Sequence, residues 1–229
     1  MASERLVEEI VGQIKPRVGE YRLEKANAVV QTGPDSNSMS NTAGSKILDQ
    51  CIFKSFKIVE QEYLDKVRES YALGFGEVAK VGCCALVAIQ REKELVVANL
   101  GDCRAVLGSA NKDSKDQTRA ALATRLTSDH NARMPLELLQ LQLEHPGEDD
   151  VVVCKSPTAC YVKGRLQLTR ALGDAYLKYP EFNGLVKQHH RGRHIPQPYT
   201  APYVKSVPDV AHFSLSEQDR FLVRDEDRC

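Results

Sequence analysis

Residues 99–108 read Asn-Leu-Gly-Asp-Cys-Arg-Ala-Val-Leu-Gly, and this stretch contributes most to the prediction of the fold. It places one carboxylate, Asp102, in a glycine turn between two short apolar runs. Runs rich in Val, Leu and Ala that are broken by charged or Gly-containing turns are typical of β-strands. The sequence therefore predicts consecutive antiparallel strands at residues 83–89, 95–100 and 104–107.

Upstream of these strands the apolar residues follow a helical period. Residues 4–30 have apolar side chains at three- and four-residue intervals, with a kink expected at Pro16. Residues 31–44 are polar and predict a loop. A second helix is predicted over 46–70, and its apolar positions form one buried stripe: Leu48, Ile52, Phe56, Val59, Tyr63 and Val67.

Downstream, short strand-like runs resume around one helix. Strands are predicted at 122–126, 151–154, 165–168, 210–213 and 220–223, and a helix at 134–143. Residues 109–119 predict a solvent loop, and residues 176–203, with four prolines and little periodicity, predict a long surface excursion. Because helices and strands are segregated along the chain, the pattern favours an α+β layered fold.

The composition limits the class of protein. The chain has 229 residues, which suits one domain, and 31 basic and 31 acidic residues give no net charge. Nucleic-acid binding calls for a basic face, so we expect no nucleic-acid partner. No stretch of about 18 apolar residues and no signal peptide occur, so we expect no membrane partner and a cytoplasmic or nuclear location.

The cysteines and histidines leave alternatives open. None of the seven cysteines forms a Cys-x-x-Cys pair, and most lie in apolar runs, which favours buried free thiols. Residues 187–194 contain His189, His190 and His194 among basic residues. This segment is either a patch for phosphate, nucleic acid or a transition metal, or a solvated loop. The absence of interleaved aromatic residues favours the loop.

Two Gly-Asp turns are candidate sites for chemistry. A tight turn that lifts Asp102 to the end of a sheet can present a metal ligand, or the aspartate can cap backbone N–H groups. Residues 169–174, Thr-Arg-Ala-Leu-Gly-Asp, form a similar turn. There Arg170 and Asp174 either orient catalytic neighbours or make a structural ion pair or turn cap. Arg104 is expected to support the Asp102 turn.

Together the two turns resemble those of the type 2C, metal-dependent (PPM-type) protein serine/threonine phosphatases, which show G-D-S-R-A-V-L and S-R-A-L-G-D. Here they read GDCRAVL at 101–107 and TRALGD at 169–174. Other segments, several of them similar to the plant and pyruvate dehydrogenase phosphatase branch, follow in the same order over residues 47–223: LTSDHN at 126–131, EHP at 144–146, VKG at 162–164, DAYLK at 174–178, SVPDV at 206–210 and DRFLV at 219–223.

The resemblance implies a four-layer αββα sandwich of antiparallel sheets, with residues 1–229 as a single partial domain. It implies hydrolysis of phosphoserine and phosphothreonine with Mg²⁺ or Mn²⁺ at a two-metal site. The family supplies metal ligands from an E-D pair, D-G-H-G and D-G-x-W-D turns and a late D-N pair. This sequence has no D-G-H and no D-N, and the expectation is a chain truncated at both ends.

By resemblance, the metal ligands carried over are Asp102 and Asp227, the sixth residue beyond Phe221, and no catalytic or other cofactor-binding residue is assigned. We therefore expect a phosphatase-family protein that is weak or inactive as this chain. The alternatives are a non-catalytic module that binds phosphoproteins (a pseudophosphatase) and a truncated product with no independent role. Missing strands would leave open sheet edges and marginal stability.

Overall fold

The computed structural model describes residues 5, 8–9, 11–13, 37–110, 121–183 and 194–225. It divides the chain into two units, Met1–Glu62 and Tyr63–Cys229, which are described separately. The boundary between them lies inside the long helix α3 (Asn37–Ala72). The predicted helix at 46–70 is confirmed. Within its predicted stripe Ile52, Phe56, Val59 and Val67 are buried, whereas Leu48 and Tyr63 are half-buried.

The predicted loop at 31–44 is wrong for its last part, because α3 already begins at Asn37. The polar residues of this part have only modestly lower helix propensity, and extending an existing helix costs far less than nucleating one. In the predicted helix at 4–30, the described residues 5, 8–9 and 11–13 are helical. Pro16 lies outside the described residues.

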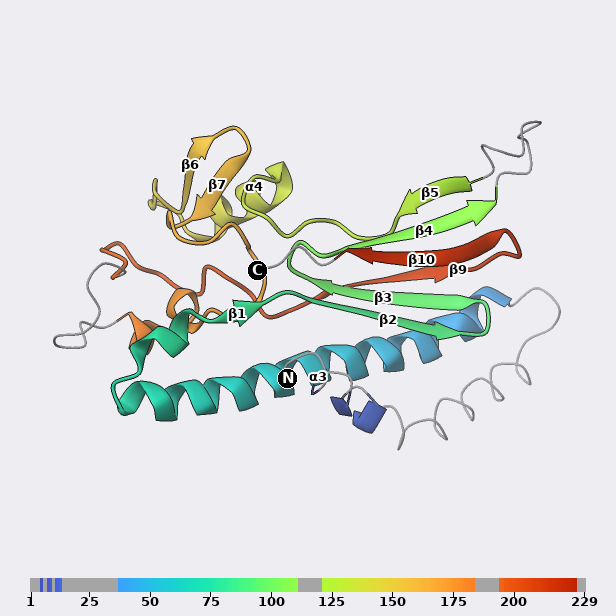
Figure 1. The fold of residues 1–229 in the computed structure, drawn as a ribbon, viewed down its shortest axis with the longest axis horizontal. Helices are drawn as coiled ribbons and strands as arrows, with labels where there is room; N and C mark the ends of the chain where they lie inside the picture. Colours follow the sequence, from blue (N-terminus) through green and yellow to red (C-terminus); the bar gives the residue numbers. More distant parts are fainter. Residues whose placement is uncertain are drawn as a thin grey trace. The chain divides into compact units, whose positions relative to one another are not determined.

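Two three-stranded antiparallel sheets lie one above the other in the second unit (Figure 1). One has the order β2-β3-β9, and the other has the order β10-β4-β5. The strand bounds match most of the predicted runs: β2 Ala85–Arg91, β3 Glu94–Leu100, β4 Arg104–Ala110, β5 Ala121–Arg125, β9 Asp209–Ser214 and β10 Asp219–Asp225. Ser109 and Ala110 extend β4 into the predicted loop, and residues 111–119 lie outside the described ones.

The strands on either side of Asp102 belong to different sheets. β3 pairs with β2 and β9, whereas β4 pairs with β10 and β5. Residues 95–100 and 104–107 were predicted as consecutive antiparallel strands, and the structure places them in different sheets. Residues 101–103 carry the chain from one sheet to the other, so that Asp102 lies at an end of the sandwich.

One apolar core joins the facing sides of the two sheets. Its buried members come from β2, β3, β4 and the ends of β4 and β5: Leu86, Leu95, Val97, Cys103, Ala105 and Leu126. Side chains alternate between the two faces of a strand, so each strand contributes every second residue. Removing this apolar surface from water stabilises the sandwich. The predicted α+β class with antiparallel sheets is confirmed.

Smaller elements pack around a second core. They are helix α4 (Pro135–Glu144), the hairpin of β6 (Val152–Ser156) and β7 (Ala159–Val162), and the short pair of β1 (Gly82–Cys83) and β8 (Leu172–Gly173). The predicted helix at 134–143 is confirmed. The predicted strand at 165–168 is wrong, since this stretch follows a turn and makes only isolated bridges, from Leu166 to Val162 and from Leu168 to Asn131. Lys163 and Gly164 have positive φ and turn the chain there.

Residues 176–203 were expected to be a surface excursion, and this is wrong for much of the segment. It contains the 3₁₀ turns η4 (Ala175–Leu177) and η5 (Pro180–Phe182), and several of its side chains are buried in the second core: Tyr176, Leu177, Phe182, Ile195 and Tyr203. The backbone here is irregular, so the buried side chains follow neither a helical nor a strand period in the sequence. Residues 184–193, with His189 and His190, lie outside the described residues, and His194 is exposed.

The expectation that the cysteines are free thiols is wrong for one pair. Cys154 and Cys160 are bonded to each other and lie opposite in the β6–β7 register, with their Cα atoms 3.9 Å apart. The hairpin register brings them together, and the sequence pattern did not reveal that hairpin. Cys51, Cys83, Cys84 and Cys103 are thiols; Cys51 and Cys103 are buried as expected, whereas Cys83 and Cys84 are half-buried.

Candidate functional site

The turn between β3 and β4 fixes the position of Asp102. Gly101 has a φ of +103°, a conformation that L side chains rarely adopt. A Cβ atom at this position would lie 2.5 Å from Sγ of Cys84, so the turn accepts no larger residue without movement. The backbone therefore holds Asp102, half-buried, where the chain passes between the sheets.

Two side chains orient the carboxylate of Asp102. The amide Nδ2 of Asn131 donates to Oδ2 at 3.3 Å, and the thiol of Cys84 lies 3.4 Å from Oδ1 as a weak donor. Asn131 comes from the segment that follows β5, and Cys84 lies between β1 and β2. Elements far apart in the sequence thus converge on the turn.

A buried histidine connects this turn to β9. The backbone N–H of Gly101 donates to Nδ1 of His130 at 3.1 Å, so Nδ1 is the acceptor and the ring proton lies on Nε2. Nε2 donates to Oδ2 of Asp209 at 2.9 Å. The backbone N–H of His130 also donates to the carbonyl of Gly101 at 3.1 Å. His130 is therefore held in one tautomer and one orientation.

Asp209 continues this network to Arg170. Its Oδ1 accepts from Nη1 of Arg170 at 2.5 Å, and Nη2 of Arg170 lies 3.6 Å from Oε1 of Glu137. The hydrogen bond from His130, with the charge of Arg170, holds the pKa of Asp209 at about 2 although burial opposes this shift. Arg170 was expected either to orient catalytic neighbours or to make a structural ion pair, and its contact with Asp209 is such an ion pair.

The second Gly-Asp turn belongs to the small β1–β8 pair. Gly173 and Asp174 both have positive φ, at +73° and +48°. The carboxylate of Asp174 packs directly over Gly82, where an added Cβ would lie 1.9 Å from Oδ2. The backbone N–H of Asp174 donates to the carbonyl of Val81 at 2.9 Å. Asp174 thus fixes the approach of β1 to β8.

Arg104 supports the Asp102 turn indirectly. Its Nε and Nη2 donate to the two oxygens of Asp129 at 3.1 and 2.9 Å. Burial would raise the pKa of Asp129, but the hydrogen bond from Arg104 and the charges of Arg125, Arg104 and Arg133 lower it. Arg104 therefore anchors the residue that directly precedes His130.

The described residues around Asp102 do not fit a two-metal centre. Mg²⁺ and Mn²⁺ prefer several oxygen ligands, whereas the groups that contact the Asp102 carboxylate are a thiol and an amide N–H. Over residues 37–110, 121–183 and 194–225, no three acidic, histidine or cysteine side chains gather as metal ligands do. Asp227 lies outside the described residues, and both metal-ligand assignments stay predictions.

Sequence reasoning gave no role to three residues that organise this site. Asp129, His130 and Asn131 were quoted only as part of the LTSDHN segment, yet they bind Arg104, Asp209 and Asp102 respectively. The available signal was a run of polar residues directly after a predicted strand. Asp209, the first residue of β9, was likewise quoted without a role.

The family model described as protein phosphatase 2C matches residues 3–223. The chain therefore belongs to the protein phosphatase 2C family. Probable protein phosphatase 2C 28 of Oryza sativa subsp. japonica is 36% identical over 172 residues, which cover 75% of this chain and 41% of that protein. Probable protein phosphatase 2C 64 of Arabidopsis thaliana is 33% identical over 174 residues, 76% of this chain and 42% of that protein.

Two solved structures share the fold. Serine-threonine phosphatase 2C from Toxoplasma gondii aligns with a TM-score of 0.55 and 18% identity over 96% of this chain and 62% of its own. A C. elegans sex determining protein aligns with a TM-score of 0.51 and 16% identity, over 91% of this chain and 38% of its own. The chain spans about two fifths of the length of the plant relatives named above.

None of the helices in the described ranges has the length and apolar composition that a bilayer crossing requires.

Proposed function

We propose that this chain binds proteins phosphorylated on serine or threonine, and that by itself it hydrolyses them weakly or not at all. Membership of the protein phosphatase 2C family supports the substrate class. The observation that carries the proposal is the Asp102 turn, whose Gly-Asp sequence resembles the family's while its carboxylate contacts a thiol and an amide.

Metal chemistry belongs to the proposal only in a limited way. Asp102, and Asp227 beyond the described residues, would supply carboxylate oxygens to Mg²⁺ or Mn²⁺, which stabilises charge on a phosphoryl group when bound. The sequence has no Asp-Gly-His turn and no Asp-Asn pair to complete such a site. No catalytic step is therefore assigned to these residues.

The second candidate is a non-catalytic regulatory module that binds phosphoproteins without turnover. The same contacts favour it, because Asn131 and Cys84 orient the carboxylate, while no three acidic, histidine or cysteine side chains gather as metal ligands do in the described residues. Its partner would be a phosphoprotein, and neither candidate calls for nucleic acid or a membrane.

A phosphatase assay with Mn²⁺ and a phosphothreonine peptide tests for the weak activity that the second candidate excludes. We expect turnover at or near the level of the protein-free blank for the wild-type chain, together with measurable peptide binding. Asp149→Ala, a change at an exposed aspartate, is the matched control for Asp102→Ala. Turnover that Asp102→Ala abolishes and Asp149→Ala retains would overturn the non-catalytic reading, and the absence of peptide binding would overturn both.

A further inference from the structure

Three arginine side chains converge on one buried carboxylate near the Asp102 turn. Arg104 of β4, Arg125 of β5 and Arg133, just before α4, all contact Asp129, whose side chain is 2% exposed. Arg104 binds both carboxylate oxygens in a fork geometry. This one pair already balances the charge of Asp129, so Arg125 and Arg133 add positive charge beyond it.

Arg125 and Arg133 are placed to share an anion. Nη2 of Arg125 lies 2.5 Å from Oδ1 of Asp129, and Nη2 of Arg133 lies 3.4 Å from Oδ2, so the two guanidinium groups approach a single carboxylate. Nε of Arg125 also donates to the carbonyl of Thr127. A guanidinium has five N–H donors, more than these contacts use, and the two side chains are 46% and 35% exposed.

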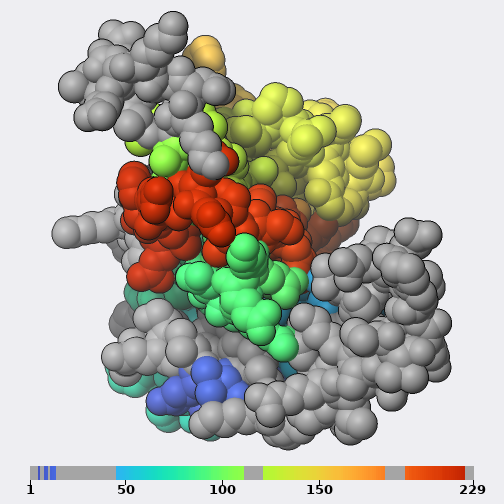
Figure 2. Space-filling view, turned by 90° about the vertical axis from the view of Figure 1, so that its right-hand side faces the viewer, coloured from blue at the N-terminus to red at the C-terminus, as the bar shows by residue number. Residues whose placement is uncertain are grey.

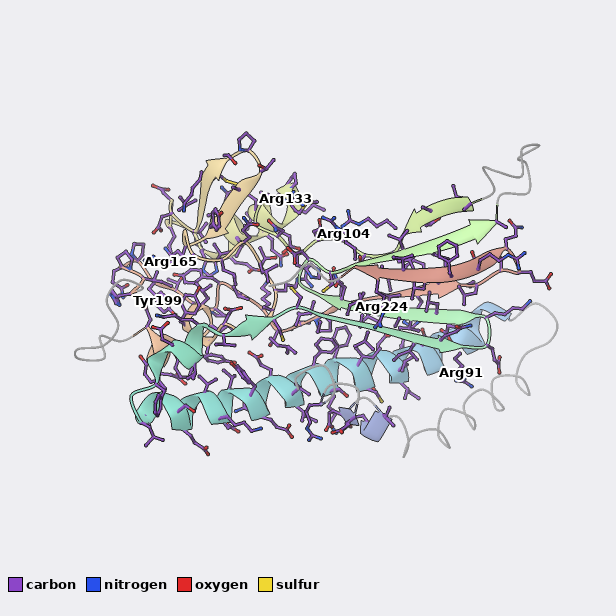
Figure 3. The ribbon with its side chains drawn as sticks, in the orientation of Figure 1. Arg91, Arg104, Arg133, Arg165, Tyr199 and Arg224 are labelled. Carbon is purple, nitrogen blue, oxygen red and sulfur yellow. A yellow bond between two sulfur atoms is a disulfide. The ribbon has the colours of Figure 1, made fainter. Side chains whose placement is uncertain are left out.

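The backbone beneath this arginine pair is held in place. The hydroxyl of Thr127 donates to the carbonyl of Cys103 and accepts from the N–H of Ala105. The N–H of Arg133 donates to Oδ1 of Asn131 at 3.2 Å. Figure 3 shows Arg104 and Arg133 beside each other between β4 and α4. A site whose backbone is already fixed loses less entropy when a ligand binds.

A row of exposed leucines begins three residues after Arg133. Leu136, Leu139 and Leu143 on α4 are 80%, 53% and 73% exposed, and their spacing of three and four residues puts them on one face of the helix. The row is about 10 Å long at 1.5 Å per residue. In Figure 2 the yellow-green surface formed by the segment around α4 is open to solvent.

Both acidic residues of α4, Glu137 and Glu144, are already engaged, and Glu144 pairs with Nζ of Lys205 at 2.5 Å. Glu137 accepts the hydroxyl of Thr169 and lies 3.6 Å from Nη2 of Arg170. It is only 15% exposed, so it does not offset the charge of Arg125 and Arg133 at the surface.

We propose that Arg125 and Arg133 bind the phosphoryl group of a phosphorylated protein segment whose apolar side chains pack on Leu136, Leu139 and Leu143. Arginine matches phosphate oxygens in bidentate geometry, and arginine clusters recognise phosphorylated motifs in other proteins. The leucine row favours a peptide over free phosphate, which has no apolar part. The proposal rests on the phosphoprotein-binding part of the proposed function and involves no metal.

The test is a metal-free titration of the full chain with a phosphoserine peptide that carries leucines three and seven residues after the phosphoserine. We expect Arg125→Gln/Arg133→Gln to weaken binding at least about tenfold, since each lost charge-assisted hydrogen bond is worth about that factor. Arg165→Gln, a change at another exposed arginine, is the matched control and should leave binding unchanged. Leu136→Ser/Leu143→Ser should weaken binding of the peptide but leave binding of inorganic phosphate unchanged.

Three outcomes would overturn the proposal: wild-type affinity in the double arginine variant, equal affinity for the unphosphorylated peptide, and inorganic phosphate binding as tightly as the phosphopeptide. Circular dichroism checks that the variants fold. The NMR signals of the Arg125 and Arg133 side chains in the wild type give a second readout, and their failure to shift with phosphopeptide would also overturn it. If wild type binds the peptide while the double arginine variant binds equally well, this inference fails and the proposed function stands.

Discussion

Nε2 of His130 donates to Oδ2 of Asp209 at 2.9 Å, while Nδ1 of the same ring accepts the backbone N–H of Gly101. The imidazole therefore connects the turn that carries Asp102 to the first residue of β9. Asp209 lies 79 positions after His130 in the sequence. A change that moves Asp209 is therefore expected to move the ring that accepts the Gly101 N–H.

Asp209→Asn should remove part of the acid sensitivity of the fold. The pKa of Asp209 is about 2 in the folded protein, against an ordinary value of 3.8. Because the folded pKa is the lower one, ionised Asp209 stabilises the fold above pH 3.8, and this contribution is lost as the pH falls toward 2. Asp209→Asn should therefore be less stable than wild type at neutral pH, by up to about 1 kcal/mol for a partly exposed ion pair.

Urea unfolding at neutral pH and near pH 2 measures this difference, which should shrink toward zero in acid. Asp149→Asn, at an exposed position, should show no such convergence. A difference in the free energy of unfolding between wild type and Asp209→Asn that is constant over the whole pH range would contradict the lowered pKa of Asp209.

Gly101→Ala should destabilise the fold more than a glycine change with the same backbone cost. Gly147 has a φ of +83° and nothing within 4 Å of an added Cβ, whereas Gly101 has a φ of +103° and the Cys84 side chain at 2.5 Å. Gly147→Ala should cost about 1–2 kcal/mol for its backbone alone. Gly101→Ala should cost about 1–3 kcal/mol more through the steric clash. Equal losses in thermal or urea unfolding would refute a steric role for Cys84.

Lys163→Met should lower the free energy of unfolding more than most single substitutions do. The side chains of Lys163 and Glu148 are 0% and 2% exposed, and Nζ lies 2.7 Å from Oε2. Removing one partner of such a pair leaves an uncompensated buried charge, which costs about 3–5 kcal/mol. Urea unfolding should show this loss, and Lys163→Met/Glu148→Gln should recover part of it.

Lys155 provides the control for this pair, since it is exposed and lies over the ring of Tyr161. Lys155→Met should change the free energy of unfolding by less than about 1 kcal/mol. If the Lys163 and Lys155 variants lose the same stability, the buried pair does not have the importance assigned to it.

Cys154→Ser/Cys160→Ser should lower the free energy of unfolding by about 2 kcal/mol, the value for a crosslink that closes a short loop. Alkylation of the unreduced, unfolded chain followed by mass spectrometry should leave both cysteines unlabelled, and a reductant should expose them. Full labelling of Cys154 without reductant would show that the bond does not form in solution.

The sequence predicted those parts of the fold whose evidence is local. The apolar stripe of α3 and the short apolar runs of β3, β9 and β10 depend on neighbouring residues, and they were found. The segment 176–203 has no such spacing, and the burial of Tyr203 and Ile195 follows from tertiary packing alone.

The candidate site was predicted in the same partial way. Asp102 was identified because a Gly-Asp turn is visible in the sequence. Its supports were not, because His130 meets Asp209 and Asn131 meets Asp102 across 79 and 29 positions of sequence. Pairing across such distances depends on which sheet each strand joins, and the sequence does not state that β3 and β4 join different sheets.

This passage of the chain from one sheet to the other has a mechanical consequence. Residues 101–103 connect β3 of one sheet to β4 of the other. The surroundings of Asp102 therefore depend on the distance between the two sheets. A spectroscopic label that senses the Asp102 turn would therefore register separation of the two sheets before either sheet unravels. In this molecule the candidate site and the earliest opening of the sandwich should be observable at the same position.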